Sequence, residues 1–72
     1  FRRALVVLGY SYVYINGFLF DSYYVYDWNG KLVKSELNYY KSEISTWGIE
    51  SGFYYLVLGK NSESNLLKLV VI

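Results

Sequence analysis

Side chains that could perform chemistry are scarce in this 72-residue sequence. It contains no histidine and no cysteine, which removes the commonest metal ligands, nucleophiles and acid–base groups that work near neutral pH. Carboxylates, tyrosines and lysines remain as the acid–base candidates. We therefore predict no catalytic residue, no metal site and no cofactor, and an enzyme is the function class that the composition favours least.

Asp21 and Asp27 are the carboxylates whose spacing comes closest to a catalytic pair, on either side of the Tyr-rich segment 23–26. A retaining glycosidase needs its two carboxyls about 5.5 Å apart in a cleft, and a chain this short has little room for one. Asp21 is better explained as the start of a turn and Asp27 as the end of a strand. Segment 61–65 is rich in oxygen ligands but holds one carboxylate, Glu63, so we expect a solvated loop and no calcium site.

Charge and hydropathy argue against two classes of partner. Seven basic and six acidic residues give a net charge of +1, which is too balanced to attract nucleic acid or an anionic membrane surface. The longest uncharged run, residues 4–20, includes glycines and polar-tipped side chains, whereas a membrane span needs about 20 predominantly apolar residues. We therefore predict no nucleic-acid partner and no transmembrane segment.

The elements that must position any site are predicted to be strands. Val, Ile, Tyr, Phe and Trp dominate the sequence, whereas Ala, the best helix former, occurs once. Turn-forming residues recur at short intervals, which is typical of an antiparallel sandwich or barrel. We predict an all-β fold, an antiparallel immunoglobulin-like β-sandwich of about seven short strands. Residues 1–72 are expected to form this single domain.

Glycines and asparagines mark the predicted turns. Asn29-Gly30 is the clearest hairpin signal and joins predicted strands Tyr23–Asp27 and Lys31–Glu36. Asn16-Gly17 is predicted to form a two-residue type I′ hairpin turn ahead of a short strand at Phe18–Phe20. The remaining strands are expected at Ala4–Leu8, Tyr10–Ile15, Tyr39–Ile44, Phe53–Leu58 and Leu66–Val71, the last two joined by a polar loop at Gly59–Asn65.

Ten tyrosines supply more rings than one thin core can bury. When one face of a sandwich strand packs in the core, the rings on its other face meet water. Exposed rings of this kind serve protein interfaces, or they are strand-forming surface residues that pair across strands, and both interpretations stay open. A sugar platform is less favoured, because few polar side chains lie between the rings. The candidate aromatic interface comprises Tyr10, Tyr12, Tyr14, Tyr23, Tyr24, Tyr26, Tyr39, Tyr40 and Tyr55.

Four blocks follow one another in an order that is not generic. In the hairpin Tyr24–Val33 a strand is followed by Tyr-Asp, two residues, and then Gly-Lys-Leu-Val. Ile44-Ser45 precedes a Ser-Gly-Phe-Tyr-Tyr-Leu segment at Ser51–Leu56, and the chain opens with Phe1–Val7 and closes with Leu67–Val71. Together these blocks resemble the type A C-terminal sorting domains of the type IX secretion system of Bacteroidota, over essentially the whole chain.

This resemblance implies a non-catalytic sorting domain that a longer secreted protein carries at its C-terminus. The missing Met at position 1 fits the cut edge of such a module. The implied partners are the outer-membrane secretion translocon and its shuttle and peptidase components. The implied location is the cell surface or the exterior, reached through the periplasm and outer membrane. The matching residues, implied as the recognition surface, are Asp27, Asn29, Gly30, Lys31, Leu32, Val33, Ser51, Gly52, Tyr54 and Lys68.

Two other functions remain open from the residues alone. High β-propensity, the absence of Pro and a low charged fraction of 18% favour strand pairing between molecules. These features suit a filament or surface-layer subunit that self-associates or accepts a partner strand. A carbohydrate-binding module is the weaker alternative. The oligomeric state in solution tests the first of these, and a glycan-binding assay tests the second.

Overall fold

The computed structural model describes residues 4–72. The first three residues of the opening block Phe1–Val7 therefore lie outside the described part. The described chain forms seven strands and no helix. They are β1 (Ala4–Val7), β2 (Tyr12–Tyr14), β3 (Ser22–Asp27), β4 (Leu32–Leu37), β5 (Glu43–Ser45), β6 (Gly52–Lys60) and β7 (Glu63–Val71). The prediction of an all-β fold with about seven short strands is confirmed.

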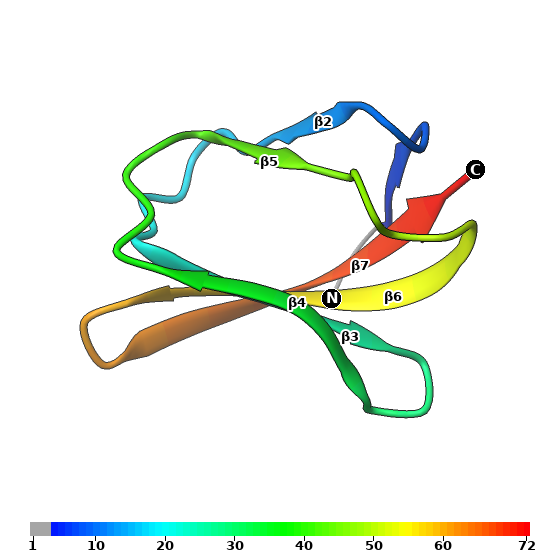
Figure 1. Ribbon diagram of the computed structural model, residues 1–72. Helices are drawn as coiled ribbons and strands as arrows, with labels where there is room; N and C mark the ends of the chain where they lie inside the picture. The colour runs from blue at the N-terminus through cyan, green and yellow to red at the C-terminus, as the bar shows by residue number, and fades with distance from the viewer. Residues whose placement is uncertain (1–3) are drawn as a thin grey trace.

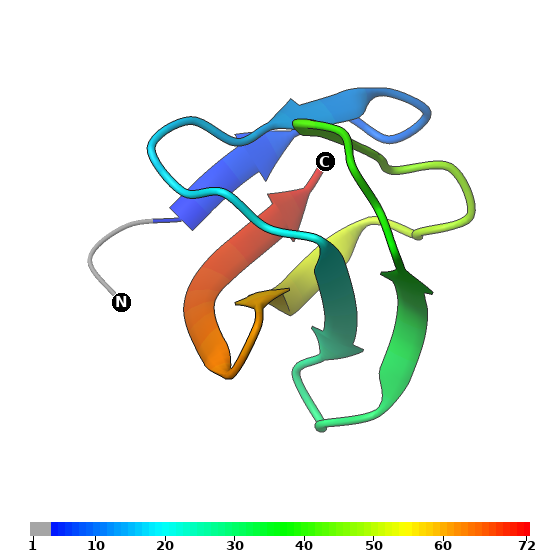
Figure 2. The same ribbon diagram turned by 90° about the vertical axis from the view of Figure 1, so that its left-hand side faces the viewer.

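The strands form two layers. Five of them make one sheet in the order β1-β7-β6-β3-β4, and β2 pairs with β5 in a second, smaller sheet. The smaller sheet lies across one face of the larger one (Figure 1), and a view turned by 90° shows the same two layers (Figure 2). This arrangement is consistent with an immunoglobulin-like sandwich.

One strand pair departs from the antiparallel expectation. β1 runs parallel to β7, with Ala4 beside Lys68 and Val7 beside Val71. A tight hairpin forces its two strands to be antiparallel, whereas strands joined by a long connection are free to take either direction. β1 and β7 are the first and last strands, so no hairpin joins them, and the five-stranded sheet is mixed.

Alternate residues of the large sheet build the core between the layers. In β6, Tyr54, Leu56 and Leu58 face the small sheet and are buried, while Phe53 on the opposite face is 60% exposed. This alternation follows from the period of two along a strand. The other buried apolar residues are Val13, Ile15, Phe20, Tyr23, Val25, Ile44, Ile49, Leu69 and Val71.

A buried hydroxyl fixes the crossing between the two layers. Thr46 Oγ1 accepts a hydrogen bond from the Ser11 backbone N–H at 2.8 Å. The same oxygen lies 2.9 Å from the carbonyl oxygen of Leu8 and 3.1 Å from that of Ser11, and the Thr46 hydroxyl donates a hydrogen bond to either of them. The segment from Leu8 to Ser11 leads from β1 in the large sheet to β2 in the small one, so this hydroxyl holds the crossing in place.

The predicted hairpins have different outcomes. The hairpin at Asn29-Gly30 is confirmed, since β3 and β4 pair on either side of it. The hairpin at Asn16-Gly17 is wrong, because Phe18–Phe20 forms no strand and β2 pairs with β5. Residues 18–20 instead lie in the connection from β2 in the small sheet to β3 in the large one, and Phe20 is buried. The loop predicted at Gly59–Asn65 is shorter than expected, since β6 and β7 continue to Lys60 and Glu63.

Candidate functional site

The loop between β3 and β4 holds several of the predicted recognition residues in a defined shape. The Asp27 carboxylate accepts hydrogen bonds from the backbone N–H groups of Asn29 and Lys31, both at 2.9 Å. The Gly30 N–H donates to the Asp27 carbonyl oxygen at 2.9 Å, and Gly30 has a φ of +89°, which side chains disfavour. Asp27 and Gly30 therefore shape the loop, while Asn29 and Lys31 are exposed on it.

The second predicted segment lies beside this loop because β6 pairs with β3. The register places Asp27 next to Tyr54, at the end of β3 and the start of β6. The corner between them, called the hairpin corner below, contains a shallow hollow of about 270 Å³ lined by Asp27, Trp28, Asn29, Ser51, Gly52, Phe53 and Tyr54. Two segments that are well separated in the sequence thus share one corner of the molecule.

Some residues of the hairpin corner are buried and maintain its shape, while others are exposed and form its surface. The Tyr54 ring is buried, and its hydroxyl donates to the Glu50 carbonyl oxygen at 2.6 Å. Burial, with the nearby Glu50 and Asp27 charges, raises the pKa of Tyr54. A Cβ at Gly52 would lie 3.6 Å from the Tyr54 ring, in ordinary contact. Trp28 and Phe53 form the exposed apolar surface of the corner.

Trp28 and Phe53 lie within the two matching blocks, but they are not among the recognition residues named from the sequence. The alternation rule carried a signal for Phe53, since it precedes the inward-facing Tyr54 on the same strand. Trp28 carried no such signal, because it lies in the loop, where period-two reasoning does not apply.

Lys68 lies away from the hairpin corner, on the side of the large sheet that the small sheet does not cover. The registers form a row across this side, in which Lys68 pairs with Tyr55, Tyr55 with Tyr26, and Tyr26 with Leu32. A register shift in β4 leaves Val33 outside the pairing, next to Leu32. Phe53, which lines the corner, also lies on this side of the sheet, which we call the outer face. Its larger side chains are Val6, Tyr24, Tyr26, Leu32, Leu37, Phe53, Tyr55, Val57, Leu66, Lys68 and Val70, and the registers add Ala4, Ser22, Ser35, Gly59 and Ser64 among the described residues.

The candidate aromatic interface is divided by the two layers. Tyr23 does not belong to any surface, because it points inward from β3 and is fully buried. Its hydroxyl donates to Glu36 Oε2 at 2.5 Å, and burial together with this bond raises its pKa well above the usual range. Tyr39 is half-buried against Tyr23, with ring centroids 5.1 Å apart, and its hydroxyl donates to the Glu43 carbonyl oxygen at 2.6 Å. Burial raises the pKa of Tyr39 as well.

The other candidate tyrosines lie on separate surfaces. Tyr24 and Tyr26 stack on the outer face with ring centroids 6.4 Å apart. Tyr12 and Tyr14 are exposed on β2, where they line a groove of about 210 Å³ with Tyr39, Lys41 and Glu43. The remaining members are Tyr55, half-buried on the outer face, and the exposed Tyr10 and Tyr40. No single aromatic surface unites them.

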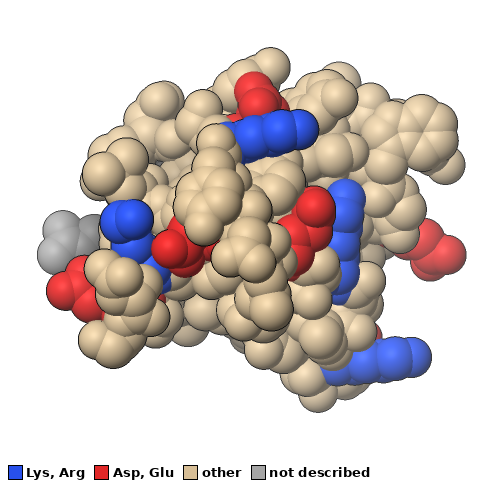
Figure 3. Space-filling model, turned by 60° about the vertical axis from the view of Figure 1, so that its left-hand side comes forward, with Lys and Arg blue, Asp and Glu red and all other residues tan. Residues whose placement is uncertain are grey.

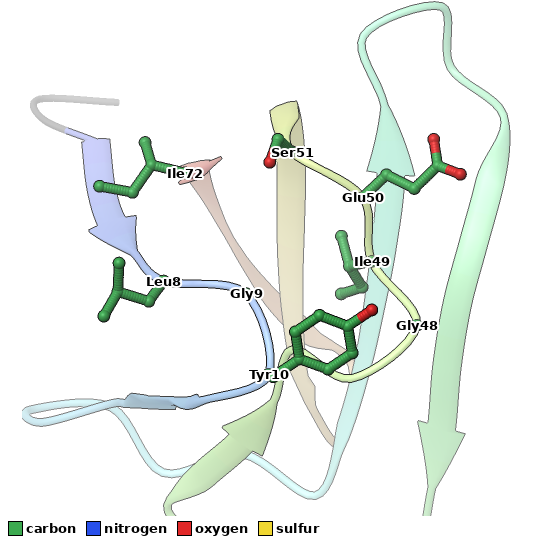
Figure 4. Close-up of a pocket in the computed structure, with 8 residues that line it drawn as sticks. All are labelled: Leu8, Gly9, Tyr10, Gly48, Ile49, Glu50, Ser51 and Ile72. Carbon is green, nitrogen blue, oxygen red and sulfur yellow. The ribbon is translucent and has the colours of Figure 1, made fainter.

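A hollow of about 620 Å³ lies between the segment after β1 and the loop before β6 (Figure 4). The Tyr10 ring reaches toward the Gly48–Ile49 side of this hollow, and Glu50 is the one carboxylate side chain that lines it. A lone carboxylate lacks the second acidic group of a glycosidase-type pair. Across residues 4–72, no group of three or more His, Cys, Asp or Glu residues could hold a metal ion.

Charged side chains are distributed without a large region of one sign on the side shown in Figure 3, where acidic and basic groups are interspersed among uncharged residues. One basic side chain has a structural role: Lys34 Nζ donates to the Ser45 carbonyl oxygen at 2.7 Å and so links β4 to β5. The described part of the chain contains no helix with the length and hydropathy of a membrane span.

Comparison with known proteins gives one match. A family model described as a secretion system C-terminal sorting domain matches residues 9–72. Searches of curated proteins and of solved structures found no match. The matched span includes β2 to β7, and therefore both segments of the hairpin corner and most of the outer face.

Proposed function

Since the chain belongs to the family of secretion system C-terminal sorting domains, we propose that the type IX secretion machinery recognises it through the hairpin corner. Domains of this family are sorting signals of the type IX system, and they direct export across the outer membrane to the cell surface or the extracellular space. The family is of a non-catalytic kind. The domain therefore acts as a folded address that is read by contact.

The observation that carries this proposal is the register of β3 with β6. It brings Asp27 next to Tyr54 and so places the start of the hairpin loop, Asp27 to Asn29, beside the Ser51–Tyr54 segment. The Asp27 hydrogen bonds order the loop before any partner arrives, which lowers the entropy cost of binding. Exposed aromatic residues next to polar groups are typical of binding hot spots, and Trp28 and Phe53 provide them here.

The proposed partners are the outer-membrane translocon, which reads the address, and the shuttle and peptidase components that act with it. We place residues 1–72 at the C-terminal end of a longer secreted protein, as a single sandwich domain. The buried Tyr54 ring and the Asp27 hydrogen bonds keep the corner in shape, while the exposed residues Asn29, Lys31 and Ser51 supply its polar contacts.

The experiment fuses the domain to a periplasmic reporter in a host that has a type IX system, and measures the exported fraction. The parent fusion should be exported. The double variant Asn29→Ala/Lys31→Glu removes exposed polar groups without touching the core, and should lower export at least about tenfold, since each lost hot-spot contact of about 1.4 kcal/mol is a factor of ten. Its thermal unfolding midpoint should match the parent's.

The matched control is Lys41→Glu, which reverses one charge on the side of the small sheet. It should leave export unchanged. Retention of the parent fusion in the periplasm would contradict the sorting function. Normal export of the double variant would show that the machinery reads another surface.

A further inference from the structure

The outer face has no covering layer within the described chain. β2 and β5 lie over the opposite face of the five-stranded sheet (Figure 1). On the outer face Val6 is 61% exposed and Leu66 is 46% exposed, and the rings of Tyr24, Tyr26 and Tyr55 are half-buried. Lys68 is the one charged side chain among the outer-face residues.

The size of the outer face indicates the kind of contact that it can make. Five strands spaced about 4.8 Å apart and about 20 Å long present a face of roughly 500 Å². This is in the range of the largest apolar patches on monomers, which are often functional. It falls short of the roughly 800 Å² that each partner buries in a stable complex. The face therefore suits a short-lived contact and is too small for an obligate dimer.

The charge pattern indicates the chemistry of the partner. If two copies of this chain packed outer face to outer face, each Lys68 would leave water for a surface whose described residues are aliphatic, aromatic or hydroxyl-bearing and include no carboxylate. A buried, unpaired ammonium is strongly unfavourable. A partner that places an acidic group opposite Lys68 within an apolar surface meets both the charge and the hydrophobic character of this face.

We propose that the outer face is a second docking surface, which binds a component of the secretion machinery that presents an apolar patch containing a carboxylate. This inference rests on the proposed function and deepens it. Phe53 belongs to both the outer face and the hairpin corner, so one component of the machinery can contact both. The corner supplies polar contacts and the exposed Trp28 ring, and the outer face supplies apolar area around one ion pair.

The test uses the same export assay with two matched double variants. Val6→Lys/Leu66→Lys adds two charges to the outer face at exposed positions. Tyr14→Lys/Tyr40→Lys adds two charges at exposed positions that lie outside the outer face. The first should lower export at least about tenfold with an unchanged unfolding midpoint, and the second should stay within about twofold of the parent.

The charge is tested separately. Lys68→Glu should lower export about as strongly as Val6→Lys/Leu66→Lys, because it sets an acid against the partner's acid, while Lys41→Glu should not. A photo-crosslinker at position 66 should form adducts that mass spectrometry identifies as an outer-membrane component of the machinery, and one at position 14 should not.

The outcomes separate this inference from the proposed function. If the parent and the outer-face variants are exported alike while Asn29→Ala/Lys31→Glu is retained, the outer face is not a docking surface and the sorting function stands. If the parent itself is retained, the sorting function fails. If the parent sediments as a dimer that Val6→Lys/Leu66→Lys converts to a monomer, a second copy covers the outer face and the inference is overturned.

Discussion

The two faces of the five-stranded sheet are made from the same strands and similar residues, yet they have different physical roles. Tyr23 and Tyr24 are neighbours on β3, but Tyr23 is fully buried beneath the small sheet while Tyr24 stacks on Tyr26 in contact with solvent. The buried hydroxyl of Tyr23 has a partner in Glu36, as a buried polar group requires. A tyrosine therefore acts as a core residue or a surface residue here according to what covers its face.

The strongest test of this difference is truncation of neighbouring rings. Tyr23→Ala removes a buried aromatic side chain and should lower the free energy of unfolding by about 3–5 kcal/mol. Tyr24→Ala on the outer face should cost about 1 kcal/mol or less. Urea denaturation followed by circular dichroism measures both values. Equal losses would mean that the two faces are buried alike.

The next test loosens the layer that covers the inner face. Thr46→Val keeps the shape of the side chain but leaves the Ser11 N–H without its partner, which should cost about 1–3 kcal/mol. The Ser11 amide should also exchange with deuterium faster. Ser35→Val, an exposed change on the edge strand β4, is the control and should be close to neutral. Unchanged exchange at Ser11 would show that the hydroxyl does not hold the crossing.

Alkaline titration tests the inner face through its proton binding. Burial raises the pKa of Tyr23, Tyr39 and Tyr54, so the folded state keeps protons that the unfolded chain releases above about pH 10. The contribution of these tyrosines to the free energy of unfolding should be fully present below that pH. It should fall as the pH rises, by up to about 1.4 kcal/mol per pH unit for each such tyrosine. Tyr23→Phe should make the fall less steep. The same slope in Tyr23→Phe as in the parent would contradict this.

The smallest effect is expected on the outer face. Leu66→Thr exchanges a half-exposed apolar side chain for a polar one and should change the free energy of unfolding by less than about 1 kcal/mol. Its neighbour Leu67 points toward the core, so Leu67→Thr should cost more. The same denaturation experiment ranks the two. A large loss for Leu66→Thr would indicate that this face is covered in the isolated domain.

Local features of the candidate site were readable from the sequence. The β3–β4 hairpin was predicted because Asn29-Gly30 separates two strand-forming runs, and Gly30 has the positive φ that such a loop needs. The family was recognised from four ordered blocks, and the match over residues 9–72 confirms it. The recognition residues themselves remain a proposal, since family membership does not show which atoms touch the machinery.

Pairings between distant segments were not readable in the same way. The Asn16-Gly17 signal resembles the Asn29-Gly30 signal, but the hairpin predicted at Asn16-Gly17 does not form, because β2 pairs with the distant strand β5. The parallel pairing of β1 with β7 was missed, because direction is determined locally only where a hairpin joins two strands. Tyr23 was placed among surface candidates, since adjacent tyrosines cannot be assigned to faces until the covering layer is known.

By itself the sequence determined the strand content, the main hairpin, the lack of histidine and cysteine chemistry, and the family, because each depends on residue types and short spacings. The tertiary structure alone decided which of the tyrosines are core, which side of the large sheet stays uncovered, and that Ser51–Tyr54 meets the hairpin loop. The physical reason is that burial and contact depend on long-range strand register. Register is chosen by the packing of the whole chain and is not encoded at any one position.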